Sequence, residues 1–242
     1  MINAVILAGN NETEKIPGKA LVDINGRPML SYVVDAAKST GIIDKILVVG
    51  NMETSEFCDA RGLEFTPGAP DILSNIIKGI NWFADDRRII IMTGDIPYIT
   101  SDAIKDFIGK SEWIGADFCY PIITRDNCER KFPGAKRTYV TLRDGTFTGG
   151  NIFYVNPSIV DRCMTVLNYV VDNRKNPAKI AFLFGPGLIF AFLFKYLSIE
   201  MIENKVCGML DITAKAIISD YAEIGNDVDK PEDLIMAKVI LA

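Results

Sequence analysis

Short apolar segments alternate along the chain with segments in which apolar residues recur every three or four positions. The short segments are rich in Ile, Val and Leu, as expected for strands buried on both faces of a sheet, and the periodic segments predict amphipathic helices. The pattern predicts an α/β protein with a mostly parallel, mixed central sheet flanked by helices. The strands expected in the first half are Asn3–Ala8, Lys45–Val49, Leu63–Phe65 and Arg88–Met92.

Local capping signals mark the helices between these strands. A helix is predicted over Pro28–Lys38, where proline near the first turn removes an N–H that has no helical partner. Two more helices are predicted over Asp71–Phe83 and Ser101–Ile108, each beginning with its capping residue.

The second half of the chain continues with shorter strands. The polar residues Arg143–Thr146 predict a hairpin turn. The expected strands are Asp117–Ile123, Tyr139–Leu142 and Asn151–Val155, and the expected helices run from Pro157 to about Val171 and over Pro231–Leu241. With no internal repeat, residues 1–242 are expected to form one domain, with a hydrophobic helical insert at about residues 174–208.

The uncharged segment Ile180–Phe194 dominates that insert, and basic residues flank it. Its fifteen residues fall short of the roughly 20 that span a bilayer. Gly185-Pro186-Gly187 is expected to break any helix there. Three alternatives stay open: a transmembrane helix, a helical hairpin that is buried or at a homodimer contact, and a peripheral element resting on a membrane or a lipid-like substrate.

The amino-acid composition excludes several classes of function. The chain has 26 basic and 31 acidic residues, hence a net charge of −5, and has no basic run, so we expect no nucleic-acid partner. It has no histidine, which excludes Ser-His-Asp triads, Cys-His pairs and His-ligated zinc. Five scattered cysteines and a start without a basic leader segment predict a cytoplasmic protein with reduced thiols, with membrane association as an alternative.

A polar loop follows the first predicted strand, from Leu7 to Lys19. Loops at the carboxyl ends of parallel strands bind ligands, and Gly9 would let backbone N–H groups approach a phosphate. Lys19 could neutralise a departing pyrophosphate. The loop is not a P-loop, because Ala20 stands where that motif places a metal-binding hydroxyl.

The stretch LAGNNETEKIPGKALVDINGRPML resembles the MobA-like NTP transferases, nucleotidyltransferases with a Rossmann-like, glycosyltransferase-A-type fold. Asn10 replaces the family's second glycine, and Lys15 is the only basic residue near the position of its loop arginine. The segment from Gly68 to Ile80 is similar to the family's base- and ribose-framing segment, although an ordinary capped helix would explain it equally well. The resemblance implies these nucleotide-binding residues: Leu7, Ala8, Gly9, Asn10, Lys15, Lys19, Gly68, Ser74 and Asn75.

Two acidic motifs resemble the family's metal ligands. Asp95, in Thr-Gly-Asp-Ile-Pro, closes a central strand, where a carboxylate can hold Mg²⁺ against phosphates. The segment from Asp227 to Leu234 resembles the family's second motif, which implies Asp229 as the second ligand and Asp227 as the alternative. Helix-dipole stabilisation explains Glu232 and Asp233 without a metal. The implied catalytic residues are Lys19, Asp95 and Asp229.

A Gly-Gly-Asn turn precedes the strand that begins near Asn151 and resembles an acceptor-binding turn. Gly150, Asn151 and Arg137 are therefore candidate acceptor-binding residues, although a simple turn explains the glycines as well. The sequence predicts a Mg²⁺-dependent nucleotidyltransferase that moves a nucleotidyl group from an NTP to a phosphate- or hydroxyl-bearing small molecule, such as a sugar phosphate or a lipid-like acceptor. Two alternatives remain: a glycosyltransferase of the same fold, and a non-catalytic nucleotide-binding or membrane-associated protein.

Overall fold

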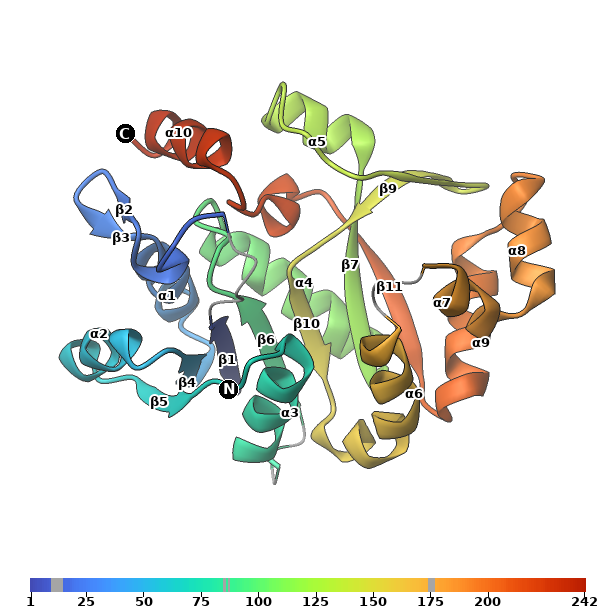
Figure 1. Cartoon of the computed structure of the whole chain (residues 1–242), viewed down its shortest axis with the longest axis horizontal. Helices are drawn as coiled ribbons and strands as arrows, with labels where there is room; N and C mark the ends of the chain where they lie inside the picture. Colours follow the sequence, from blue (N-terminus) through green and yellow to red (C-terminus); the bar gives the residue numbers. More distant parts are fainter. Residues whose placement is uncertain (10–14, 85, 87, 174–176) are drawn as a thin grey trace.

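The computed structural model describes residues 1–9, 15–84, 86, 88–173 and 177–242. Within these residues a nine-stranded sheet has the order β5-β4-β1-β6-β10-β7-β9-β8, with β11 on the free edge of β7 (Figure 1). The strands of its first half are mutually parallel, as predicted. They are β1 (Ile2–Ala8), β4 (Ile43–Gly50), β5 (Glu64–Pro67) and β6 (Ile89–Thr93). The small ribbon of β2 (Asp23–Ile24) and β3 (Arg27–Pro28) lies apart from this sheet.

The second half of the sheet is mixed. One antiparallel strand, β10, separates β6 from β7, and β11 runs parallel to β7. The carboxyl ends of β1, β6, β7 and β11 therefore meet at one edge of the sheet, where ligands bind in such folds. The strands are β7 (Phe118–Thr124), β8 (Val140–Leu142), β9 (Gly145–Gly149), β10 (Ile152–Val155) and β11 (Ala214–Ser219).

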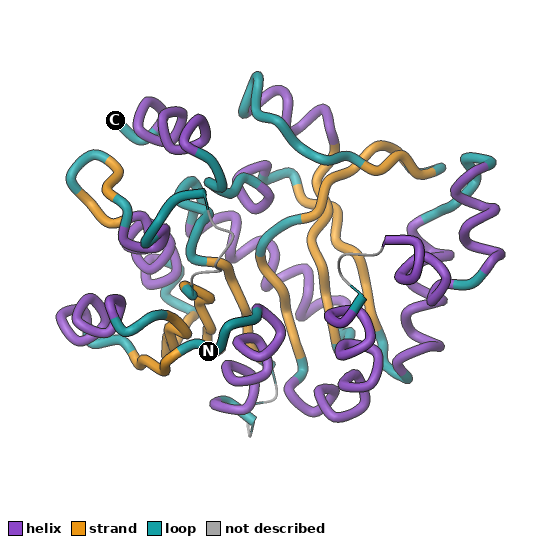
Figure 2. Tube along the Cα trace, viewed as in Figure 1, coloured by secondary structure: helices purple, strands orange, loops and turns teal. Residues whose placement is uncertain are grey.

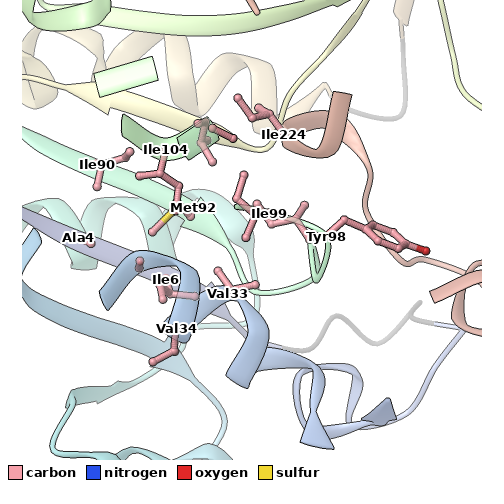
Figure 3. Packing of buried hydrophobic residues seen from close by; sticks show 14 of the residues in the cluster. Ala4, Ile6, Val33, Val34, Ile90, Met92, Tyr98, Ile99, Ile104 and Ile224 are labelled. Carbon is pink, nitrogen blue, oxygen red and sulfur yellow. The ribbon is translucent and has the colours of Figure 1, made fainter. Parts of the chain in front are cut away.

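Helices cover both faces of the sheet, and the side-chain alternation of the strands divides the core between them (Figure 2). On one face α1 (Met29–Ser39), α2 (Glu53–Arg61) and α4 (Ser101–Ile114) pack against the even-numbered residues of β1. Figure 3 shows this core, in which Val33 from α1 and Ile104 from α4 lie around the sheet. The opposite face carries α3 (Ile72–Trp82), α6 (Val160–Asp172) and α9 (Ile199–Leu210).

One of the two helix-capping predictions is confirmed, and the other was wrong. Asp71 caps α3 as predicted, accepting a hydrogen bond from the backbone N–H of Ser74 at 2.9 Å. The prediction for Ser101 was wrong: Thr100 caps α4 through the N–H of Ala103, and Ser101 is the first helical residue. Adjacent hydroxyl residues leave a cap ambiguous by one position in sequence. The helix also continues beyond Ile108, to Ile114.

Several elements were absent from the sequence predictions. The helix α2 is short and mostly polar, so no apolar period marks it. The other elements not foreseen are β2, β3, α5 (Arg125–Lys131), β9, β11 and the 3₁₀ helices η1 (Lys19–Leu21) and η3 (Ala222–Gly225). The predicted helix from Pro157 to about Val171 forms as the 3₁₀ helix η2 (Pro157–Ile159) followed by α6, and α10 (Pro231–Ile240) forms where predicted.

The Phe-rich segment forms two short helices, α7 (Pro177–Phe184) and α8 (Pro186–Leu193), beside α9 at the edge of the molecule (Figure 1). Gly185 separates them with φ 84°, so the predicted break is confirmed. Phe182 and Phe194 are 70% and 72% exposed, so the described side chains of the segment are not all buried. Among the described residues, no helix is long and apolar enough to cross a bilayer.

Candidate active site

Two of the predicted nucleotide-binding residues, Gly9 and Gly68, lie against the side chain of a third, Asn75, near the start of α3. Its side chain accepts a hydrogen bond from the N–H of Ala69 at 2.5 Å and donates one to the carbonyl of Ala69 at 3.1 Å. A Cβ atom on Gly9 would lie 3.2 Å from Nδ2 of Asn75, and one on Gly68 would lie 3.2 Å from its Oδ1. The loops that follow β1 and β5 are thus brought together by one buried amide.

The other predicted nucleotide-binding residues have separate positions. Ser74 donates its hydroxyl to Asp71 at 2.6 Å, so its contact in this structure is that of a capped helix. Leu7 accepts a hydrogen bond from the N–H of Gly94 at 2.8 Å, which joins the ends of β1 and β6, and Ala8 is buried at the end of β1. Lys15 is exposed, and Asn10 lies outside the described residues.

Lys19 is held at the carboxyl edge of the sheet by its local backbone. Gly18 has φ 60°, a left-handed conformation that suits glycine, and it precedes the short helix η1 that Lys19 begins. The ammonium group of Lys19 lies 2.6 Å from Oδ2 of Asp95 and also forms an ion pair with Asp229. Its side chain is only 9% exposed. In this structure the three predicted catalytic residues therefore lie in direct contact.

Asp95 is oriented by its neighbours at the end of β6. The hydroxyl of Thr93 donates to Oδ1 of Asp95 at 2.5 Å, which leaves Oδ2 facing Lys19. The backbone carbonyl of Asp95 accepts from the N–H of Val228 at 2.9 Å. That bond fixes the segment before α10 against the central strand.

The segment before α10 carries the other two carboxylates. Asp233, in the first turn of α10, accepts hydrogen bonds from the N–H groups of Asp229 at 3.1 Å and Lys230 at 2.9 Å. Asp233 thus orders the backbone that presents Asp227 and Asp229. Oxygen atoms of Asp95, Asp227 and Asp229 all lie within 4.8 Å of one another.

The pKa values of the groups in this cluster reflect the strong attraction of its carboxylates for a cation. Burial alone would lower the pKa of Lys19, but the charges of Asp95 and Asp229 outweigh it and raise that pKa to about 12. Burial, followed by the charges of Asp95 and Asp229, raises the pKa of Asp227 to about 6. Burial also acts to raise the pKa of Asp229, but the hydrogen bond and charge of Lys19 lower it overall.

The donor set of the cluster fits Mg²⁺. This ion is held in proteins by a few carboxylate oxygens and completes its shell with water and substrate phosphates. Asp95 and Asp229, the predicted ligands, and Asp227, the second choice, supply three such oxygens. Lys19 lies between two of them, so a metal ion bound to both would require the ammonium group to move.

The predicted acceptor residues lie at the same edge of the sheet. Between β9 and β10, the N–H of Gly150 donates to the carbonyl of Pro121 at 3.0 Å. The N–H of Asn151 donates to Ile224 at 2.9 Å, and its carbonyl accepts from Thr93 at 3.0 Å. The Gly-Gly-Asn turn therefore joins the central strand to η3, and the Asn151 side chain makes no hydrogen bond within the described part of the chain.

Arg137 lies on the far side of the carboxylate cluster. One terminal nitrogen donates to the side-chain oxygen of Asn226 and lies 3.7 Å from Oδ1 of Asp227. Its side chain is 9% exposed, and its Nε is buried without a hydrogen-bond partner within the described residues. In this structure Arg137 contacts the loop that carries the metal-ligand candidates, so its role in holding an acceptor stays a prediction.

The sequence did not identify Thr93, Asn226 or Asp233 as supporting residues. A threonine two residues before a strand-terminal aspartate was the available signal for Thr93. The partner of Asn226 lies 89 residues away in the chain, so no local pattern could reveal it. Asp233 was ascribed to the helix dipole alone, whereas it also accepts two backbone hydrogen bonds.

Comparison with known proteins decides the family. The model of the MobA-like NTP transferase domain matches residues 4–141, more than half of the chain. The chain belongs to the MobA-like NTP transferase family. A solved structure of a hypothetical transferase from Thermus thermophilus is 32% identical, with a TM-score of 0.86, and the match covers 96% of this chain and 99% of that one.

More distant members of the same fold carry named activities. A 3-deoxy-manno-octulosonate cytidylyltransferase from Acinetobacter baumannii is 28% identical over 137 residues, 52% of this chain and 54% of its own length. Its counterpart from Colwellia psychrerythraea is 29% identical over 106 residues, 41% of this chain and 38% of its own length. The matches thus span about half or less of these relatives. The structure of CMP:2-keto-3-deoxy-manno-octonic acid synthetase complexed with CTP has a TM-score of 0.63 at 14% identity, covers 100% of this chain and 98% of its own, and shows the fold alone.

Proposed function

We propose that this MobA-like NTP transferase moves a nucleotidyl group from an NTP to a small-molecule acceptor in a Mg²⁺-dependent reaction that releases pyrophosphate. The observation that carries the proposal is the contact of Lys19 with Asp95 and Asp229, with Asp227 beside them, at the carboxyl edge of the sheet. Carboxylates gathered round one buried lysine give a site that is selective for cations and for the phosphates they bind. The cytidylyltransferases among the relatives support CTP as the first donor to test.

The transfer step requires positioning and charge neutralisation more than proton chemistry. An oxygen of the acceptor attacks the α-phosphorus of the NTP. The bond from that phosphorus to the oxygen bridging to the β-phosphate breaks, and pyrophosphate leaves with the bonding electron pair. An acceptor phosphate is already ionised and needs no general base, which suits a chain without histidine.

The protein's own groups have distinct parts in this step. Lys19 would leave the carboxylates and neutralise the departing pyrophosphate. Asp95 and Asp229 would hold Mg²⁺, which would neutralise the α-phosphate and orient the attacking oxygen. The Asn151 amide, which the described chain leaves without a partner, would hydrogen-bond the acceptor. Arg137 would add positive charge behind Asp227.

The donor assignment predicts stabilisation by nucleotide. At 100 times its dissociation constant, CTP with Mg²⁺ should stabilise the fold by about 2.7 kcal/mol. That corresponds to a rise in Tm of roughly 5–10 °C for a chain of this size. A thermal-shift panel of CTP, GTP, ATP and UTP, each with Mg²⁺ or with a chelator, measures it. If no NTP stabilises the protein, the nucleotidyltransferase proposal fails.

We also propose that the hairpin of α7 and α8 makes peripheral contact with a membrane. Its exposed aromatic residues include Phe182, Phe190, Phe192 and Phe194. Residues 177–198 contain two lysines and no acidic residue, in a chain of net charge −5. Aromatic side chains beside basic ones suit the interface of an anionic bilayer.

The membrane contact predicts that the protein co-sediments with anionic vesicles. Replacing Phe190 and Phe192 with serine should abolish co-sedimentation, because both rings are at least half exposed and serine leaves little apolar area to insert. Trp113→Ser, which removes a ring that is 89% exposed on α4, is the matched control and should sediment like the wild type. Equal sedimentation of the double variant and the wild type would exclude this contact.

A further inference from the structure

An apolar trough lies on the α3–α6–α9 face of the sheet, next to the predicted acceptor site. It consists of two adjoining cavities of about 240 and 250 Å³ that share Phe118 and Val206 as walls. The first runs under α3 and α6, and its lining contains no charged residue. The second cavity has two charged residues in its lining, Lys215 and Glu203, and they form an ion pair with each other at 2.6 Å. The trough thus offers a ligand an almost wholly apolar surface.

A row of aromatic rings connects the trough to the carboxyl edge of the sheet. Phe118 stacks on Phe153 with ring centroids 6.2 Å apart, and Phe153 stacks on Tyr120 at 5.7 Å. The hydroxyl of Tyr120 lies 1.7 Å from the place where a Cβ on Gly149 would stand, in the predicted acceptor turn. Asn151 lies two residues before Phe153 and directly precedes β10, which begins at Ile152.

The trough also approaches the predicted nucleotide site. Leu73 lines the cavity under α3 and immediately precedes Ser74 and Asn75. Each cavity is about eight times the ~30 Å³ that a water, or a methylene group of similar size, occupies in a liquid. Space of this size and polarity, beginning between donor and acceptor sites, suits part of a substrate.

We infer that the acceptor is an amphiphile, with a phosphate or hydroxyl head at Asn151 and an apolar chain of roughly 8–16 carbons lying in the trough. This rests on the proposed nucleotidyl transfer and names the acceptor class for it. The described part of the chain gives the Tyr120 hydroxyl no hydrogen-bond partner, so it is free to bind the head. The exposed aromatic hairpin leads directly into α9, whose Val206 forms a wall of the trough. A polar sugar would leave this surface uncovered.

Binding of alkyl phosphates to the intact protein tests the inference without any nucleotide. Each methylene buried in the trough should tighten binding about fourfold. Octyl phosphate, with four more methylenes, should therefore bind roughly 250-fold more tightly than butyl phosphate, measured by calorimetry below the micelle concentration. Equal affinities for butyl and octyl phosphate would overturn the inference, and this comparison needs no variant.

Val206→Phe and Asn204→Phe form a matched pair on α9. Val206 borders both cavities, so a larger ring there should weaken octyl phosphate binding at least tenfold and leave butyl phosphate binding unchanged. Asn204 is exposed on the same helix, and its variant should bind both like the wild type. Tight octyl phosphate binding by a folded Val206→Phe protein would place the chain elsewhere and overturn the inference.

Transfer assays separate this inference from the proposed function. Chain-length-dependent binding without NTP binding would refute nucleotidyl transfer but support the trough as a ligand site. Pyrophosphate release with polar acceptors only would support transfer and refute the amphiphile. Supplying dodecyl phosphate as monomers or within phosphatidylcholine vesicles distinguishes a free acceptor from a membrane-resident one.

Discussion

Replacing Asp95 with alanine is expected to lower the rate of pyrophosphate release by at least about 1,000-fold. Its carboxylate belongs to the three-carboxylate cluster, and Thr93 donates a hydrogen bond to its Oδ1, so the side chain is ordered before any metal binds. A metal ion contributes several kcal/mol of charge stabilisation in the transition state, and each 1.36 kcal/mol is a factor of ten. The backbone bond from Val228 to the Asp95 carbonyl remains in the variant, so the loop should keep its place.

The matched control is Asp220→Asn. Asp220 also follows a strand, β11, at the same edge of the sheet, but its side chain accepts only from Asn127, at 3.3 Å, among the contacts of the described residues. Its removal should leave the rate within about twofold of wild type. Equal turnover by the Asp95 variant and the wild type would show that the metal assignment is wrong.

The same assay separates the two alternative functions. Wild-type protein that binds an NTP but never releases pyrophosphate with any acceptor would support the non-catalytic alternative. Cleavage of a nucleotide-sugar with transfer of the sugar would support the glycosyltransferase alternative. The sequence disfavours the latter, because the end of β6 reads Thr93-Gly94-Asp95 into the following loop, where such enzymes are expected to carry an Asp-x-Asp motif.

The first half of the fold could be predicted because its strands are buried on both faces. In β1, Val5 packs on one face and Ile6 on the other, so the strand is a continuous apolar run that no surface helix would show. The elements of the second half have weaker patterns of apolar residues in the sequence. In β11 the buried residues follow neither a period of two nor a continuous run, and the neighbouring helix α9 has no buried residue, so neither element stands out in the sequence.

The candidate site was predictable in its residues but not in its contacts. Local motifs identified Lys19, Asp95 and Asp229, and topology explains why carboxyl-edge residues could meet. Lys19 and Asp229 are 210 residues apart, however, and no spacing rule predicts that they form an ion pair. The sequence assigned Lys19 to phosphates, whereas in the structure its charge is compensated by carboxylates.

The apolar trough shows the same limitation more strongly. Phe118, Tyr120 and Phe153 occupy alternating positions on two strands, which in sequence indicates only buried sheet. Their stacking into one row depends on the antiparallel pairing of β10 with β7, in which Tyr154 lies opposite Cys119. The sequence therefore predicted a lipid-like acceptor only through the Phe-rich segment, and the structure adds the trough that we propose for its chain.

Lys19→Met should change both activity and the response to metal. Loss of a preorganised positive group at the departing pyrophosphate is expected to cost about 10²–10³-fold in rate.

Without the ammonium group, Asp95 and Asp229 repel each other and Asp227, so the metal-free variant should be less stable than wild type by about 1–3 kcal/mol. Mg²⁺ would no longer compete with Lys19, so it should raise the Tm of the variant more than that of the wild type. Lys238→Met, which removes an exposed lysine in the last turn of α10, is the control and should match the wild type in both measurements. A variant that loses activity but shows the wild-type response to Mg²⁺ would mean that lysine and metal do not share these carboxylates, and that the metal site lies elsewhere.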